Sequence, residues 1–193
     1  MLLRNRIPQI EPVEAPRAGG QEHVPPSAVA VIGWLNANRI DYVLVGPVAR
    51  AIRGESTARG PVAIVPAPYG RNLDRLARAL MAARARLRTE ADSGLISAAP
   101  DTVHVKLDAE KLLRSKRWTL RCGEHDVDVE GRPAGSPRYQ ELLYESVRFE
   151  LAAEVSVEVA APEDIEHYSH VQRTGVAPEI TVSRVVRDPE ASL

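Results

Sequence analysis

The sequence predicts an α/β (α+β) fold in which helices flank a mixed β-sheet. The stretch from Asp41 to Pro66 reads as strand, tight turn, short helix, loop and strand, because Gly46-Pro47 ends one apolar run and prolines bound the next. Both runs, 42–45 and 62–65, are apolar on successive residues. This pattern is typical of strands that are covered on both faces, as in an α/β sheet.

The composition limits the class of protein. The chain has 193 residues, of which 44% are hydrophobic, so it is long enough for one domain with a core. The net charge of −1 gives no general attraction to nucleic acid or to an anionic membrane. Cys122 is the single cysteine, which excludes an internal disulfide and favours a reducing, cytoplasmic setting. No apolar run approaches the roughly 18 residues of a membrane span, so we expect no membrane partner.

The chain divides into three parts. Residues 1–26 are rich in proline and lack periodicity, which predicts a disordered arm. Residues 27–172 carry the periodic segments and form the expected domain. Residues 173–193 are expected to be a tail, in which 180–186 could add an edge strand.

Hydrophobic periodicity and turn residues predict the elements of the domain in order. Ser27 is the expected N-cap of the first helix, Pro47 begins the second, and Asp108 caps a later one. The expected elements are a helix 27–38, a strand 40–45, a helix 48–53, a strand 62–65, a helix 70–87, a strand 102–107, a helix 109–115, strands 117–122 and 125–131, a helix 139–144, strands 147–151 and 155–159, and a helix from residue 162.

The residues of the first half also resemble a known family. Tyr-Val-Leu-Val-Gly at 42–46, a small helix, an Arg-Gly loop and a second strand look like the core of the nucleotidyltransferase superfamily. This superfamily has the DNA polymerase β-like fold and includes the minimal nucleotidyltransferases and their toxin–antitoxin relatives. The segments that begin at Tyr139 and Pro162 resemble the C-terminal half of the toxin-related members. The resemblance covers roughly residues 27–171 and implies a nucleotidyltransferase-like fold.

The resemblance also implies where a nucleotide would bind. The Gly46-Pro47 turn corresponds to the turn that cradles the phosphates, with Arg50 and Arg53 nearby. The two carboxylates that hold magnesium in the family fall here on Pro61 and Ala63, whose side chains offer no oxygen ligand. Pro47 has no N–H to donate to a phosphate. The alternative for the two arginines is that they are solvated charges of the helix.

A third family carboxylate is retained. Asp128 in Val-Asp-Val occupies its position, and Asp126 is the alternative register. Because side chains alternate along a strand, Asp126, Asp128 and Glu130 share one face. Three carboxylates on one face could bind a divalent ion. The alternative is that they are solvent-facing residues of a half-exposed antiparallel strand.

Three functional hypotheses follow. The first is a pseudoenzyme: a non-catalytic binding or regulatory protein of nucleotidyltransferase type, without a cofactor, whose partner is a nucleotide or a protein. The second is an active, magnesium-dependent nucleotidyltransferase that uses Asp128 with Asp126 or Glu130. The third is a module that contacts nucleic acid through the basic segment 71–88, although such a face is also common as a plain solvated surface. His167 and His170 have a spacing compatible with metal ligation, but a surface pair is the alternative.

Overall fold

The computed structural model describes residues 24–55, 59–88, 107–114, 117–131 and 136–174. Within these ranges the chain forms six helices and seven strands. The elements are α1 (Pro26–Ala37), β1 (Tyr42–Val45), α2 (Gly46–Ile52), β2 (Val62–Pro66), α3 (Gly70–Ala82), β3 (Arg86–Leu87), α4 (Ala109–Arg114), β4 (Arg117–Cys122), β5 (His125–Glu130), α5 (Tyr139–Glu145), β6 (Val147–Ala152), β7 (Val155–Val159) and α6 (Pro162–Thr174).

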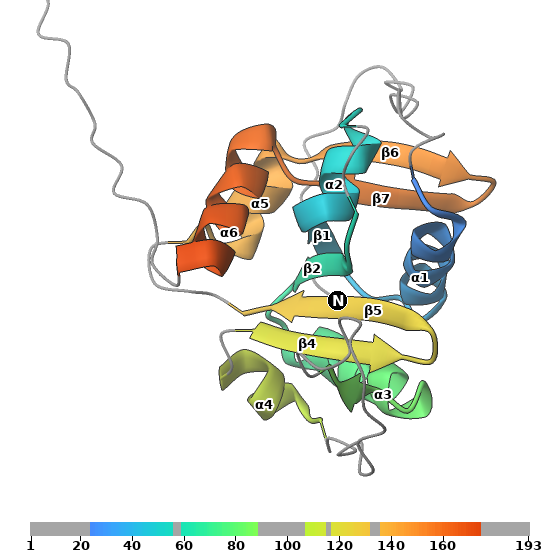
Figure 1. Cartoon of the computed structure of the whole chain (residues 1–193). Helices are drawn as coiled ribbons and strands as arrows, with labels where there is room; N and C mark the ends of the chain where they lie inside the picture. The colour runs from blue at the N-terminus through green and yellow to red at the C-terminus, as the bar shows by residue number, and fades with distance from the viewer. Residues whose placement is uncertain (1–23, 56–58, 89–106, 115–116, 132–135, 175–193) are drawn as a thin grey trace, which may run out of the picture.

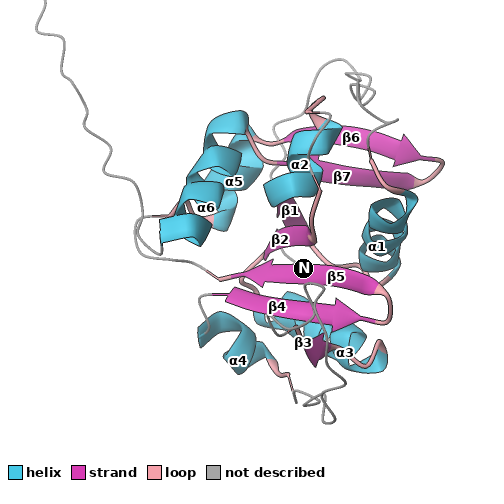
Figure 2. Cartoon of the chain, viewed as in Figure 1, coloured by secondary structure: helices cyan, strands magenta, loops and turns pink. Residues whose placement is uncertain are grey.

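The strands form one mixed sheet in the order β3-β4-β5-β2-β1-β7-β6 (Figure 2). β1 pairs with β2 in antiparallel fashion, whereas β2 pairs with β5, and β1 with β7, in parallel. Two antiparallel hairpins, β4–β5 and β6–β7, lie on either side of the central strands, and β3 pairs with β4 at one edge of the sheet. The predicted α/β class with a mixed sheet is therefore confirmed.

The helices cover the sheet at several places (Figure 1). α1 packs on β7, β2 and β5, while α5 and α6 both contact β1. α2 packs on β1, β2 and α6, which brings the Gly46-Pro47 turn against the centre of the sheet. α3 and α4 pack against each other beside the β3–β4–β5 end.

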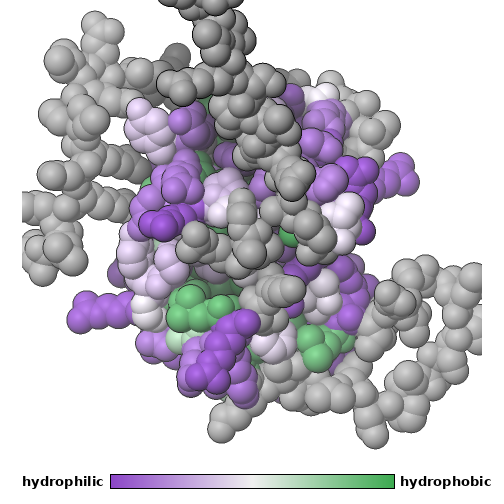
Figure 3. Space-filling view, turned by 90° about the vertical axis from the view of Figure 1, so that its left-hand side faces the viewer, coloured by the Kyte–Doolittle hydropathy of each residue, from purple (hydrophilic) through white to green (hydrophobic). Residues whose placement is uncertain are grey.

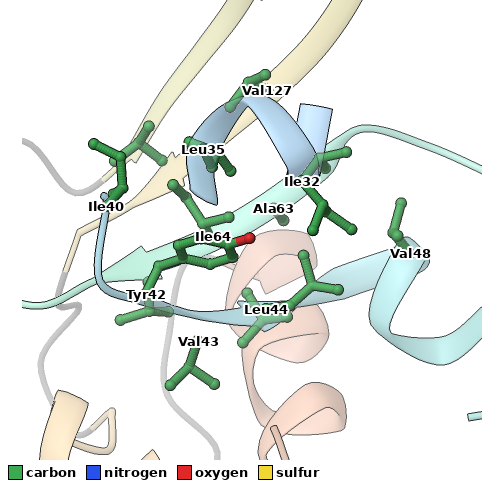
Figure 4. Packing of buried hydrophobic residues seen from close by; sticks show 14 of the residues in the cluster. Ile32, Leu35, Ile40, Tyr42, Val43, Leu44, Val48, Ala63, Ile64 and Val127 are labelled. Atoms are coloured by element: carbon green, nitrogen blue, oxygen red, sulfur yellow. The ribbon is translucent and has the colours of Figure 1, made fainter. Parts of the chain in front are cut away.

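The core lies on both faces of the central strands, and one part of it lies between these strands and α1. Figure 4 shows Tyr42 and Leu44 of β1 on the side of the strand that faces α1, with Val43 on the opposite side. All four residues of β1 and the first four of β2 are buried, so both strands are covered on both faces as predicted. The burial of these successive apolar residues supplies the main driving force for folding.

A buried asparagine joins three segments of this region. The Asn72 side chain is 1% exposed and accepts a hydrogen bond from the Asp41 N–H at 2.8 Å. Its Nδ2 donates to the carbonyls of Asp41 at 2.9 Å and Ala67 at 3.0 Å. Asn72 therefore binds backbone groups just before β1 and just after β2, one of which, the Asp41 carbonyl, also accepts the Ala67 N–H at 2.9 Å.

The first helix begins earlier than predicted. The expected N-cap, Ser27, lies inside α1, because Pro26 is already helical and Pro25 is the N-cap. Proline suits the first helical position since its missing N–H would have no partner there. Val24 is also buried, so the last residues of the expected arm belong to the folded domain.

The third helix ends earlier than predicted. α3 stops at Ala82 and not near Leu87, because Arg84 has a φ of 51°. This left-handed conformation breaks the helix, and the chain then enters β3. Leu87, which was expected at the end of the helix 70–87, lies in β3 and is 38% exposed.

The hairpins and helices after Leu107 agree with the prediction within two residues, except that α6 extends to Thr174 and so beyond the predicted boundary at 172. Asp108 caps α4 as expected, since its Oδ1 accepts the Lys111 N–H at 2.8 Å. The predicted loop 91–100, nearly all of the predicted strand 102–107 and the possible strand 180–186 lie outside the described residues.

Candidate functional site

Three segments that the sequence links to one site lie side by side in the sheet. Val45 of β1 is the cross-strand partner of Ala63 of β2, and Ala63 is in turn the partner of Asp128 of β5. The Gly46-Pro47 turn directly follows Val45. The structure therefore brings together the turn, Ala63 and Asp128.

Asp128 is fully buried and lies between two arginines. Its side chain is 0% exposed; Arg88 approaches one carboxylate oxygen at 3.2 Å, and Arg117 pairs with the other. Glu130 is 4% exposed and pairs with Arg117 at 3.1 Å. The interpretation of these carboxylates as solvent-facing is therefore wrong for Asp128 and Glu130, which arginine side chains cover, whereas the Asp126 side chain is 30% exposed.

Asp126 completes the row of carboxylates on this strand. Arg121 approaches it at 2.9 Å and Arg88 at 3.3 Å. Partial burial alone would raise the pKa of Asp126, but the hydrogen bonds and positive charges of Arg121 and Arg88 outweigh it and lower the pKa below its usual value. Asp126 is therefore held in its ionised form.

The six charges of this cluster balance one another. We call Asp126, Asp128, Glu130, Arg88, Arg117 and Arg121 the arginine–carboxylate cluster. Its three carboxylates each face at least one guanidinium group, so the positive charge that a metal would bring is already supplied by the chain. A divalent ion would have to displace these guanidinium groups to reach the oxygens.

Part of this cluster could have been found from the sequence. In the β4–β5 hairpin, Arg117 is the partner of Glu130 and Arg121 of Asp126. Residues that face each other across an antiparallel pair interact directly, so the predicted turn at Gly123-Glu124 already implied these pairs. The pairing of Arg88 with Asp128 could not be predicted in this way, because the two residues are 40 positions apart in the sequence and come together only in the folded chain.

The Gly46-Pro47 turn packs tightly on the start of β2. Gly46 has a φ of +70°, and a Cβ at this position would lie 3.0 Å from the Cβ of Ala63. A Cβ on Gly60 would lie 2.8 Å from the Pro47 ring. The proline ring therefore lies against the backbone of Gly60, at the turn where the resemblance expects a phosphate.

The two arginines expected to bind a nucleotide make contacts within the protein. Arg50 pairs with Glu166 of α6 and with Glu55 at 3.3 Å. Arg53 donates to the carbonyls of Ala160 at 2.8 Å and Val159 at 3.3 Å. Burial lowers the pKa of Arg53, and the charge of Glu163 only partly offsets this. Both side chains thus tie α2 to the segment that joins β7 to α6.

Other candidate chemistry is limited. Among the residues that the structure describes, no three His, Cys, Asp or Glu side chains are grouped to hold a metal ion. His167 lies 3.3 Å from the hydroxyl of Ser136 and so takes part in a local contact. Burial raises the pKa of Cys122 to about 11, with the charge of Asp126 adding to the effect, so the thiol is not activated as a nucleophile.

The basic segment 71–88 is not one helical face. Arg84, Arg86 and Arg88 lie beyond the end of α3. Arg75 is paired with Asp41 at 3.2 Å, and Arg88 belongs to the arginine–carboxylate cluster. The positive charge that the sequence placed on one helix is therefore divided between separate structural contacts.

The surface gives little further indication of a partner. Figure 3 shows a face on which the described residues are mainly hydrophilic, with hydrophobic residues gathered in small areas of its lower half. In the part of the chain that the structure covers, no helix has the length and apolar character needed to cross a membrane.

Comparison with known proteins does not assign a family. No protein-family model matches the chain, and no curated protein matches it either.

Proposed function

We propose that this protein is a non-catalytic binding or regulatory protein with a nucleotidyltransferase-like fold. The observation that carries the proposal is the pairing of buried Asp128 with Arg88 and Arg117 beside Ala63. A two-metal transfer reaction needs several oxygen ligands that are free to bind cations. Here one of the three positions is an alanine, another a proline, and the remaining carboxylate faces guanidinium groups.

The surroundings of the turn support the same proposal. Arg50 and Arg53 stabilise the packing of α2, and Pro47 lies against Gly60. A nucleotide triphosphate would have to break these contacts before its phosphates could reach the backbone of the turn. The proposed partner is therefore a protein or another ligand that does not require this turn.

The direct test is an assay for magnesium-dependent transfer of labelled nucleotide to RNA, protein or a small acceptor. We expect no turnover with ATP, CTP, GTP or UTP. Turnover that is lost in Asp128→Ala, while the variant remains folded by circular dichroism, would overturn the proposal in favour of an active nucleotidyltransferase.

A binding measurement separates loss of catalysis from loss of nucleotide binding. Ligands that bind only the native state raise its melting temperature. We expect magnesium with ATP or CTP to leave the melting temperature of the full chain unchanged. A clear rise that disappears in Arg50→Ala would indicate a nucleotide-binding protein that has kept the site but not the chemistry.

A further inference from the structure

A groove separate from the arginine–carboxylate cluster lies at the edge of the molecule. Its volume is about 720 Å³, and it is bordered by Tyr139 and Leu143 of α5, by the β6–β7 hairpin and by the residues that lead from α1 into β1. Ligand sites in proteins commonly have volumes of roughly 300–1,000 Å³. None of the residues of the arginine–carboxylate cluster lines this groove.

Several charged side chains of the groove are paired with one another. Arg75 contacts Asp41 at 3.2 Å, and Arg148 contacts Glu158 at 3.7 Å. Arg148 also donates to the hydroxyl of Ser156 at 2.6 Å. These pairs stabilise the walls of the groove and leave little charge for a ligand.

Two exposed charges in the lining remain, one of each sign. The side chains of Arg39 and Glu154 make no hydrogen bond or ion pair with the described part of the chain. The groove therefore offers a ligand one cationic and one anionic group.

Both residues have an unusual backbone conformation. Arg39 has a φ of 54° and Glu154 a φ of 63°, and Arg84 is the third non-glycine residue with a positive φ in the described ranges. Glycine is the usual residue at such positions, because any side chain adds strain there. Arg39 follows the end of α1, where the Ile40 N–H bonds to the Leu35 carbonyl, and Glu154 lies in the β6–β7 turn, so these conformations belong to a helix end and a hairpin turn that both border the groove.

The rest of the lining supplies an apolar surface between these charges. Ile40 and Val157 are buried and lie in the lining, and Leu143 of α5 is 39% exposed. Tyr139 adds an aromatic ring on the same side. A ligand held at both ends by charge could bury an apolar side chain against these residues.

We infer that this groove binds a short zwitterion, namely a free amino acid or a peptide of a few residues. Its carboxylate pairs with Arg39, its ammonium group with Glu154, and its side chain contacts Leu143 and Tyr139. This inference does not depend on the proposed function, because the two sites share no residue.

A series of probes tests the inference on the full chain. Glycine, diglycine, triglycine and tetraglycine separate the ammonium and carboxylate groups by increasing lengths, and the matching peptides with a C-terminal leucine add an apolar side chain. We expect calorimetry to show that one length binds best and that the same length with a C-terminal leucine binds more tightly. At a probe concentration of ten times Kd, the melting temperature should rise by about 3 °C. No binding by any probe at about 10 mM, a concentration above the millimolar affinity of weak ligands, would overturn the inference.

Three glycine substitutions separate binding from folding. Arg39→Gly and Glu154→Gly relax a strained backbone, so the variants should fold as well as the wild type while binding the best probe about tenfold more weakly or worse. Arg84→Gly relaxes the third strained position outside the groove and should leave binding unchanged. Amidation of the probe's carboxylate should weaken binding to the wild type but not to Arg39→Gly. Equal affinity of the wild type and both groove variants would contradict the proposed contacts.

Discussion

Asp128 lies directly beside Ala63 across the parallel β2–β5 pair, and both of its carboxylate oxygens face arginine side chains. If this arrangement holds β5 in place, Asp128→Ala should lower the free energy of unfolding by about 2 to 4 kcal/mol. The loss is somewhat below the ~3–5 kcal/mol of a wholly buried pair, because Arg88 and Arg117 keep part of their surface in water. Urea unfolding measures this loss of free energy.

Exposed Asp74 provides the control, since Asp74→Ala should change the free energy of unfolding by less than about 0.5 kcal/mol. Similar values for the two variants would show that the cluster contributes little.

The lowered pKa of Asp126 predicts a dependence of stability on pH. A carboxyl group whose pKa is lower in the folded than in the unfolded state stabilises the fold above its unfolded pKa, near 3.8, and this contribution is lost as the pH falls through the folded pKa. Asp126→Asn should therefore be less stable than the wild type at pH 7, and the difference should be smaller at pH 3, below the unfolded pKa. Melting temperatures at both pH values test this. A difference that stays constant with pH would assign the effect to packing instead of charge.

The conformation of Gly46 predicts a strong response to a small change. Gly46→Ala places a methyl group 3.0 Å from the Cβ of Ala63 at a φ of +70°, so we expect a loss of about 2 kcal/mol in unfolding free energy. Gly70 offers a matched control, because it starts α3 with open space around the Cβ position. Gly70→Ala should be neutral or slightly stabilising. Equal losses at both positions would mean that the turn is not tightly packed on β2.

The three hydrogen bonds between the Asn72 side chain and backbone groups predict a further stability effect. Asn72→Ala leaves the N–H of Asp41 and the carbonyls of Asp41 and Ala67 without this partner, so a loss of about 2 to 4 kcal/mol is expected in urea unfolding. Within the described ranges, the exposed amide of Gln140 bonds only to the Tyr69 hydroxyl, at 2.9 Å. Gln140→Ala should therefore cost less than about 1 kcal/mol. A small loss in Asn72→Ala would indicate that water replaces the amide.

Much of the fold could be predicted from the sequence, because it depends on local patterns. Strands β1 and β2 are apolar on successive residues, and the β4–β5 and β6–β7 hairpins have clear turn residues between alternating runs. The end of α3 could not be predicted, since Arg84 looks like a good helix residue and its left-handed conformation is set by the chain that follows.

The site was predictable only in part. Period-two alternation correctly put Asp126, Asp128 and Glu130 on one face, but it could not show that this face is buried. Burial depends on β5 lying between β2 and β4 and on Arg88 reaching across from the end of β3. Contacts of this kind join residues far apart in sequence, and a single sequence carries no local signal for them.

The central claim is that guanidinium groups occupy the place of cations around Asp128, and diffraction from crystals soaked in manganese and ATP tests it most directly. Manganese scatters anomalously, so any bound ion would appear as a separate peak. The account predicts no peak within coordination distance of the Asp128 carboxylate, with Arg88 and Arg117 still paired to it. Two cations seated between Asp128 and the Gly46-Pro47 turn would contradict the account.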